Sequence, residues 1–345
     1  MAAATERVLV CILGETRAHA LTWENFERNV LVELSADLAI CIGLPKQYDT
    51  ANPFYQSAKY RWTIPEFDDW GDAFDLAARA SNLPPDWRRL LRIRHQWLGG
   101  IKGPGAHPGS AGILLFFRWL LLQKLRENDL LSQYDRFIVT RSDFYYWCPH
   151  PPLQILDPRY VWIPRGEDYG GFTDRHVVAS AHDIVACLDV MDDVLRRPQE
   201  LYREMHHFFD WNLEQYLRFQ FRKKQIEGRV RRYPYVMTTV RGPADSSRWA
   251  KGAFDPSVGM IIKYQSEKRL ADEFHGKILS KHDWLQQYSA PRLDTLVSAP
   301  DGFSQASPPL RPVARCLLLL DRTPWLGSAL RLLRAAYRLL RSRAS

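Results

Sequence analysis

Charged side chains follow two apolar runs in the middle of the chain. Arg141 and Asp143 come directly after the run 137–139, and a second run, 160–163, leads into an acidic loop that begins near Asp168. Strands that end at carboxylates place those carboxylates at one edge of a sheet, where α/β proteins bind ligands. The spacing therefore predicts a cleft that handles a phosphorylated substrate.

Asp143 is the first candidate in this cleft. A carboxylate here suits a divalent cation, Mg²⁺ or Mn²⁺, that bridges the phosphates of a nucleotide. Arg141, two residues earlier, offers forked donors to a diphosphate, and both side chains project to the same side if the strand continues. The alternative is an ion pair between Arg141 and Asp143 that closes the sheet edge. One acid stands in the sequence Ser142-Asp143-Phe144, so a clamp of two acids is incomplete.

The loop 166–176 holds further candidates. Asp168 and Asp174 are predicted as the general base or as partners of sugar hydroxyls. The adjacent glycines at 170 and 171 allow close approach to a ligand. His176 is either a third polar contact or a histidine satisfied within a strand, and the whole loop is otherwise an acidic surface loop without chemistry.

Two other segments contribute candidates. Gly14, Thr16 and Arg17 directly follow the first apolar run and are expected to contact a nucleotide, although this pattern is neither of the glycine-rich phosphate-binding fingerprints. Glu214 is expected to turn toward the cleft as a third catalytic acid, the alternative being an exposed helical glutamate.

The elements that must position these residues alternate between strand and helix. Such an order predicts an α/β fold with a mixed, mainly parallel sheet, because parallel strands need crossover connections. We expect strands at 7–13, 38–43, near 137–139, 160–163 and 232–240, helices at 21–34, 110–128, 183–196 and 200–224, and loop at 62–70.

Composition excludes several classes of protein. Five scattered cysteines without a CxxC pair argue against a disulfide framework or a structural zinc site, and favour a reducing compartment. The N-terminus lacks a signal-peptide pattern, and no apolar window is long enough for a membrane span. Of the net charge of +8, residues 311–345 carry +7 (eight arginines and one aspartate), so residues 1–310 are nearly neutral. Nucleic-acid binding is therefore not expected.

The C-terminal segment carries that charge on one side of a helical pattern. Residues 325–343 place four arginines within a narrow arc opposite leucines, as in an interfacial helix on an anionic membrane. The alternative is a terminal helix that packs on the body or on a second subunit. We expect a domain at 1–297, a linker at 298–312 and this amphipathic tail at 313–345.

Together the elements resemble the GT-A glycosyltransferase fold of bacterial surface-polysaccharide enzymes. The resemblance rests on four segments within roughly residues 7–241, namely 8–17, 134–143, 174–176, and 212–217 with Val240 and Arg241. It implies that Gly14, Thr16 and Arg17 contact the nucleotide, and that Asp143 holds the metal on the sugar diphosphate. Arg141, Arg175 and His176 complete the implied donor site.

The resemblance predicts a glycosyltransferase that moves a sugar from a nucleotide-diphosphate donor to a lipid-linked or surface-glycan acceptor. Its expected location is the cytoplasmic face of the membrane, to which the tail anchors it. The competing hypothesis is a non-catalytic scaffold with the same fold in a polysaccharide-assembly complex, favoured by the single acid at Asp143. A metal-dependent phosphoesterase would require a denser cluster of His and Asp than the sequence contains.

Overall fold

A seven-stranded sheet runs through the part of the chain that the computed structural model describes, which is residues 6–93, 96–103, 109–207, 211–242, 245 and 250–287. Its strand order is β3-β2-β1-β4-β7-β6-β8. In this sheet β7 is antiparallel to both β4 and β6, whereas the other neighbouring pairs are parallel. The predicted mixed, mainly parallel α/β sheet is confirmed. The strands are β1 Val8–Gly14, β2 Asp37–Leu44, β3 Tyr60–Pro65, β4 Arg136–Thr140, β6 Val161–Pro164, β7 Val177–Ser180 and β8 Val230–Tyr233.

The central strands are buried on both faces, which explains their continuous apolar sequence. All seven residues of β1 are buried. Because successive side chains alternate between faces, Leu9 and Cys11 pack into one apolar cluster, whereas Val10 and Ile12 pack into another. The sheet thus separates two cores.

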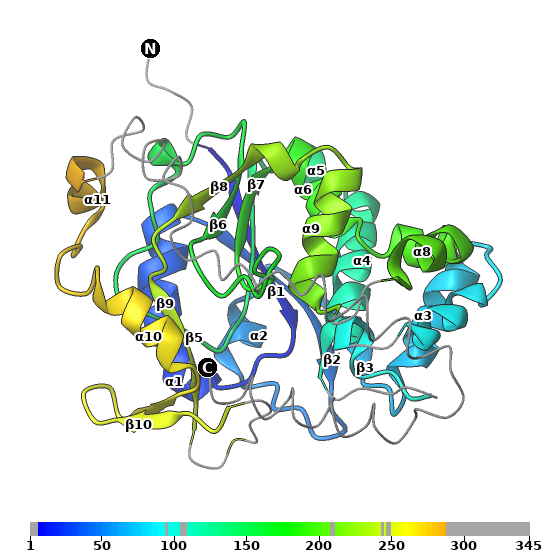
Figure 1. The fold of residues 1–345 in the computed structure, drawn as a ribbon. Coiled ribbons are helices and arrows are strands. Elements are labelled where there is room, and N and C mark those ends of the chain that lie inside the picture. The colour runs from blue at the N-terminus through cyan, green and yellow to red at the C-terminus, as the bar shows by residue number, and fades with distance from the viewer. Residues whose placement is uncertain are drawn as a thin grey trace, which may run out of the picture. The chain divides into compact units, whose positions relative to one another are not determined.

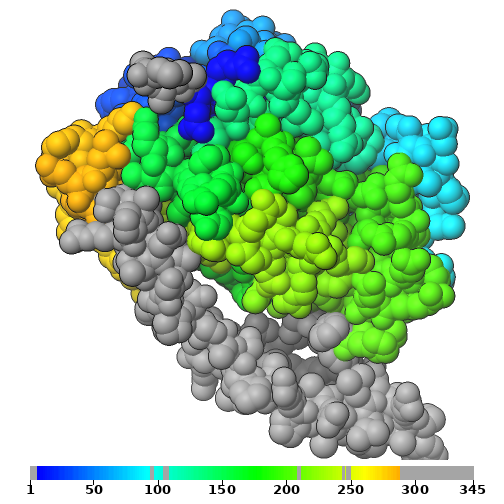
Figure 2. All heavy atoms as spheres, turned by 90° about the horizontal axis from the view of Figure 1, so that it is seen from above, coloured from blue at the N-terminus to red at the C-terminus, as the bar shows by residue number. Residues whose placement is uncertain are grey.

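Helices cover both faces of the sheet, as Figure 1 shows, so the body has three layers. The core on one face is formed with α3, α4 and α6 to α9, and the core on the other face with α1, α2 and the segment of α10 and α11. In Figure 2, α10 and α11 (orange) lie beside the blue N-terminal part of the chain. The helices are α1 His19–Phe26, α2 Pro53–Ser57, α3 Trp70–Ala80, α4 Ala111–Glu127, α5 Leu130–Gln133, α6 Ala181–Leu188, α7 Asp192–Arg196, α8 Pro198–Met205, α9 Leu213–Lys223, α10 Gln265–Asp272 and α11 Lys281–Gln287.

A smaller antiparallel sheet lies next to the large one. It has the order β10-β11-β9-β5, formed by β5 Phe144–Tyr146, β9 Met237–Arg241, β10 Ala253–Asp255 and β11 Met260–Ile262. Three residues, 141–143, separate β4 of the large sheet from β5 of the small one. Asp143 therefore sits at the junction of the two sheets.

Several predicted elements differ from the structure. The segment 62–70 was predicted as loop, yet its first part is the edge strand β3, in which half-buried Tyr60, Trp62 and Ile64 alternate with exposed residues. The predicted helices 183–196 and 200–224 are each broken into two helices. The predicted strand 232–240 is divided between β8 and β9, because Pro234 between them cannot donate to a sheet ladder. The helical turn after Phe26 widens into a π-helical segment, Glu27–Val32.

The predicted linker 298–312 and tail 313–345 lie outside the described residues. Among the described helices, none combines the length and apolar character that crossing a membrane requires. Nothing in the fold tests the predicted domain boundary at residue 297.

Candidate functional site

The candidate site lies where the strand order of the large sheet reverses direction. β2 and β3 extend from one side of β1, whereas β4 pairs with its other side. In open α/β sheets, ligands bind outside the carboxyl ends of the strands at such a switch point. The residues that leave β1 and β4 there are Gly14 to Arg17 and Arg141 to Asp143.

The loop after β1 is held rigidly. Gly14 has a φ of +87°, a conformation that favours glycine and turns the chain out of the strand. The Thr16 hydroxyl lies 2.7 Å from the Tyr48 hydroxyl, and Asn52 Nδ2 donates to Thr16 Oγ1 at 2.8 Å. Gly14 and Thr16 therefore shape the loop, and the Thr16 hydroxyl is engaged by protein groups.

Ser142, after the end of β4, contacts this loop through its side chain. Its buried hydroxyl lies within hydrogen-bond distance of the carbonyl oxygens of Glu15, at 3.0 Å, and Arg17, at 3.1 Å. The Arg17 side chain, 38% exposed, pairs with the Glu15 carboxylate. The backbones on either side of the switch point thus form one unit from which Arg17 and Arg141 extend.

Asp143 is buried and is bound by two guanidinium groups. Arg141 donates to both carboxylate oxygens, from Nε to Oδ1 and from Nη2 to Oδ2, each at 2.8 Å. Arg241 Nη1 donates to Oδ2 at 2.6 Å. Burial alone would raise the pKa of Asp143, but Arg141 and then Arg241 outweigh it and hold that pKa well below its usual range. The ion pair that the sequence left open as an alternative is present.

The small sheet contributes two buried cationic residues, Arg241, which donates to Asp143, and Lys263. Arg241 ends β9 and is 2% exposed, and Lys263 directly follows β11 and is 8% exposed. Burial and the neighbouring charges of Arg241 and Arg141 lower the pKa of Lys263 to about 8. β11 pairs with β9, with Ile262 opposite Val240, and Lys263 N donates to Thr239 O at 2.8 Å, so Lys263 and Arg241 lie on neighbouring strands.

The donor set at Asp143 does not fit a divalent cation. Such an ion takes several oxygen ligands, but both Asp143 oxygens already accept hydrogen bonds from guanidinium groups, and two positive charges stand where the ion would bind. Within the described ranges, no group of three or more His, Cys, Asp or Glu side chains could hold a metal.

The loop 166–176 packs on the start of α9. Phe172 N donates to Glu214 O at 3.0 Å, and a Cβ added to Gly171 would fall 1.9 Å from that same carbonyl oxygen. The close approach that Gly171 permits is thus to the backbone of α9 rather than to a ligand. The contact also brings this loop beside the Glu214 side chain.

Asp168 stabilises this loop. Its Oδ1 accepts from Thr173 N at 3.0 Å and from Arg232 Nη1 at 2.8 Å, an ion pair to β8. These contacts account for a structural function of the carboxylate. Among the three predicted catalytic acids, Asp174 is on the loop that packs against the first turn of α9, Glu214 is in that turn, and Asp168 supports the loop.

Asp174 and Glu214 form an acidic pair. Burial first, and then the charge of Asp174, raise the pKa of Glu214 to about 8, although Arg175 opposes the shift. Arg118, buried in α4, donates from Nη2 to the Asp174 carbonyl at 3.0 Å and so fixes the backbone of that residue. Glu214 can therefore exchange a proton near neutral pH, as a general base or acid must.

The acidic pair is close to the basic residues around Asp143. Burial lowers the pKa of Arg141, but the charges of Asp143 and, further away, Asp174 raise it above its usual value. Arg175 acts on the same guanidinium with the opposite sign. The charge of Asp174 therefore acts on the Arg141 guanidinium, which links the acidic pair electrostatically to the basic residues.

Arg175 pairs with two carboxylates from different parts of the chain, Glu167 and Glu267. Its Nη1 donates to Glu167 Oε2 at 2.8 Å and to Glu267 Oε1 at 2.6 Å, and its guanidinium lies 4.7 Å from the centre of the Tyr264 ring. Arg175 is 5% exposed, and Glu267 in turn accepts from Thr239 N on β9 at 2.5 Å. The residue thus joins the acidic loop to the small sheet.

His176 lies in the core and not at the site. It is 0% exposed, its Nδ1 is 3.0 Å from Thr140 Oγ1, and its Nε2 is 3.1 Å from His150 Nε2. Burial, with the neighbouring His150, lowers its pKa well below the usual value, so the ring is neutral. The predicted ligand contact is replaced by the predicted alternative, a histidine satisfied by its own fold.

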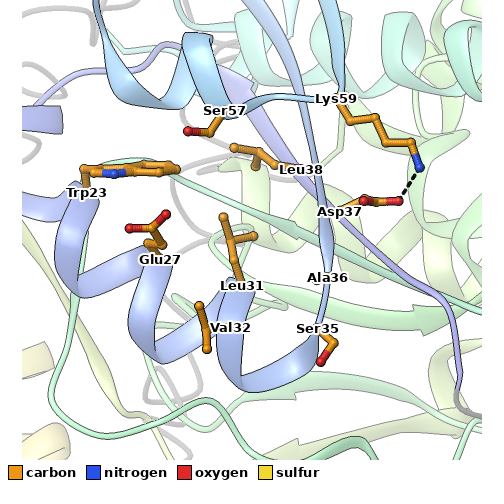
Figure 3. Close-up of a pocket in the computed structure, with 10 residues that line it drawn as sticks. All are labelled: Trp23, Glu27, Leu31, Val32, Ser35, Ala36, Asp37, Leu38, Ser57 and Lys59. Carbon is orange, nitrogen blue, oxygen red and sulfur yellow. Dashed lines mark hydrogen bonds and ion pairs between the residues drawn. The ribbon is translucent and has the colours of Figure 1, made fainter.

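Two surface hollows lie away from these charges. One, of about 300 Å³, is formed around Trp23 and the amino end of β2, the opposite edge of the sheet from Asp143 (Figure 3). Its charged pair is satisfied, because Lys59 Nζ lies 2.6 Å from Asp37 Oδ2. The other, of about 500 Å³, lies between α1 and the segment after β5. Neither hollow is lined by residues of the candidate site.

Sequence reasoning missed Lys263 and Arg118, and it named Arg241 without assigning a role. Arg118 carries a signal, since a charged residue in the apolar helical pattern of α4 needs a polar partner inside the protein. Lys263 carries none, because its short strand gives no indication of which sheet edge it joins. A search of protein-family models found no match to the chain, and a search of curated proteins found no significant match.

Proposed function

We propose that this chain is a glycosyltransferase that uses a nucleotide-diphosphate sugar as donor. The observation that carries the proposal is the adjacency of a basic group of side chains around Asp143 and the acidic pair Asp174–Glu214 at the switch point of an α/β sheet. A sugar–diphosphate donor needs cations for its leaving group, and its acceptor needs a base. The GT-A fold that the sequence resembles has the same general sheet class.

The donor binds across the switch point. Arg17 and Arg141 from the large sheet and Arg241 and Lys263 from the small sheet neutralise the diphosphate. The loop after β1, held by Thr16 and Ser142, forms the nucleotide side of the site. Cations already in position stabilise charge on the departing group without reorganising at the moment of reaction.

The acidic pair acts on the acceptor. The acceptor hydroxyl oxygen forms a bond to the anomeric carbon, and the bond from that carbon to the diphosphate oxygen breaks. The hydroxyl proton passes to the Asp174–Glu214 pair, and the electron pair leaves with the nucleoside diphosphate. Because Glu214 has a pKa of about 8, the pair holds a proton more strongly than ordinary carboxylates and is a correspondingly stronger base.

The proposed acceptor and the proposed cellular location of the protein rest on the sequence of the tail and not on the described residues. We propose that residues 325–343 bind an anionic membrane surface at the cytoplasmic face, where a lipid-linked or surface glycan serves as acceptor. Four arginines on one side of that segment support the proposal.

The competing function is a non-catalytic scaffold, which the engagement of Asp143 by two arginines favours. A single experiment separates the two. Wild type and Glu214→Gln are incubated with UDP-, GDP-, CMP- and dTDP-sugars and an extract of surface glycan, and nucleotide release is measured. If the chain is a transferase, wild type releases nucleotide from one donor class, and Glu214→Gln releases it at least about a hundredfold more slowly. A scaffold releases none from any donor.

A further inference from the structure

Four cationic side chains come from the segments that meet at the junction of the two sheets. We call Arg17, Arg141, Arg241 and Lys263 the basic cluster. Arg141 and Arg241 donate to Asp143, the Arg17 carbonyl is 3.1 Å from the Ser142 hydroxyl, and Lys263 follows β11, which pairs with β9. Asp143 offsets one of these charges, and Glu15, which pairs with Arg17, offsets another. The remainder is an excess of positive charge in a largely buried place, which is unfavourable unless an anion joins it.

Arg241 has donors without acceptors. Its Nη1 is engaged by Asp143 Oδ2 and by its neighbouring carbonyl, Val240 O, both at 2.6 Å. Its Nε and Nη2 are buried and have no hydrogen-bond partner within the described part of the chain. These two nitrogens form one side of the guanidinium fork, the geometry that binds two oxygens of a phosphate. A buried donor left unsatisfied costs about 1–3 kcal/mol.

Other buried arginines do not form a comparable site. Arg118 has one unpaired nitrogen, and Arg136 has the same unpaired edge as Arg241. Arg136, however, lies at the start of β4, away from the other cations, and its Nη1 is 3.6 Å from Glu6 Oε1. The unpaired edge of Arg241, by contrast, lies in a group that includes Arg141 and Lys263.

Lys263 adds a point charge beside that fork. It is 8% exposed, its Nζ lies 4.9 Å from the centre of the Tyr264 ring, and no acceptor within the described ranges hydrogen-bonds to it. The groups that face it are Arg241, Arg141 and Arg17, with Asp143 as the opposing charge. An ammonium held among like charges without a carboxylate of its own is suited to an oxyanion.

We propose that Arg241 and Lys263 form a subsite for the diphosphate of the donor that works without a divalent cation. The inference rests on the proposed function and deepens it, because it names the protein groups that take the place of a metal. The free edge of Arg241 binds two oxygens of one phosphate, and Lys263 binds the other. Asp143 positions the arginines and does not touch the ligand.

Titration calorimetry of the full chain with inorganic pyrophosphate in EDTA tests the subsite. Pyrophosphate carries the diphosphate without nucleoside or sugar, so binding reports on this subsite. We expect binding in EDTA, about tenfold or more weaker in Lys263→Met, and unchanged in the control Lys277→Met, which removes an exposed lysine from the same part of the chain. Binding that requires Mg²⁺, or equal affinity in wild type and Lys263→Met, overturns the subsite.

Asp143→Asn gives a second, opposite readout. If Asp143 held a metal, wild type would bind pyrophosphate only with Mg²⁺ and Asp143→Asn would abolish that binding. If it holds Arg141 and Arg241, its neutralisation leaves pyrophosphate affinity in EDTA unchanged or tighter. Circular dichroism of each variant verifies folding, and Lys263→Met remains decisive if Asp143→Asn does not fold.

The subsite and the proposed function fail separately. Metal-free pyrophosphate binding without nucleotide release from any donor leaves the subsite standing and rejects the transferase. Nucleotide release that depends on Mn²⁺, with no pyrophosphate binding in EDTA, keeps the transferase and rejects the subsite.

Discussion

Gly171 lies directly against the backbone of Glu214. A Cβ at position 171 would fall 1.9 Å from the Glu214 carbonyl oxygen and 2.3 Å from Gln215 N. The neighbouring Phe172 N donates to that carbonyl at 3.0 Å. The acidic loop can thus pack directly on the first turn of α9 because residue 171 has no side chain. This contact places the loop that carries Asp174 against the turn that carries Glu214.

Gly171→Ala should therefore separate the loop from α9. We expect a loss of about 1–3 kcal/mol in the free energy of unfolding, measured with denaturant, because the backbone must move to admit the methyl group. Gly228→Ala is the matched control, since a Cβ there meets nothing within 4 Å. Equal stability of the two variants would show that the contact is not tight in solution.

The acidic pair should control the pH dependence of transfer. The Glu214 pKa of about 8, raised by burial and by Asp174, means that the pair holds a proton at neutral pH and loses it as the pH rises. We expect kcat to increase with pH through about pH 8. Glu214→Gln should lower kcat by about 10²–10⁴-fold and remove this increase with pH, whereas Glu200→Gln, at an exposed position of α8, should retain it. If kcat of Glu214→Gln still increases with pH in this way, a residue other than Glu214 is the general base.

The buried histidines should make the protein sensitive to acid. Burial lowers the pKa of His150 to about 4, and that of His176 well below the usual value of 6.5. The unfolded chain then binds protons that the folded chain does not, so stability falls as the pH decreases from 6.5 toward 4. His150 alone contributes about 3 kcal/mol to this loss.

Unfolding free energies at neutral and at acidic pH test this prediction in His150→Gln, which keeps an amide donor and acceptor but does not titrate. We expect a smaller decrease with acid than in wild type, whatever its stability at neutral pH. The unfolding free energy of His282→Gln, a change at an exposed position of α11, should decrease with acid as that of wild type does. Parallel curves for all three proteins would mean that the histidines are not the groups responsible.

The tail should bind anionic membranes. Replacing Arg331, Arg334, Arg338 and Arg341 with glutamine removes about 1 kcal/mol each near such a surface, which predicts a roughly thousandfold loss of affinity. Co-sedimentation with vesicles that contain phosphatidylserine measures it, and neutral vesicles are the control. Equal binding to both kinds of vesicle would instead favour packing of the tail on protein.

The sequence predicts the elements whose pattern is local. β1 and β4 are continuous apolar runs with charged residues after them, so both the strands and the residues at their ends could be predicted. β3 could not, because an edge strand exposes alternate residues and its aromatic, polar sequence is equally typical of a loop. Breaks inside helical patterns, such as that between α8 and α9, also leave little local signal.

The partners of Asp143 show where sequence reasoning ends. The pairing with Arg141 could be anticipated because the residues are two apart. Arg241, 98 residues away, reaches Asp143 only because β9 pairs with β5. Lys263 lies on the strand next to Arg241 only because β11 pairs with β9. No spacing rule predicts these pairings. Gly171 was identified as a place of close approach, but only the fold shows that α9 occupies it.

Donor binding in the absence of metal tests the central claim most directly. The melting temperature of the full chain is measured in EDTA with UDP-, GDP-, dTDP- and CMP-sugars, the last of which carries one phosphate instead of two. A donor at a hundred times its dissociation constant stabilises by about 2.7 kcal/mol. We expect one diphosphate sugar to raise the melting temperature and the CMP-sugar to leave it unchanged. If no diphosphate sugar raises it in EDTA, the site is not the metal-free donor site described above.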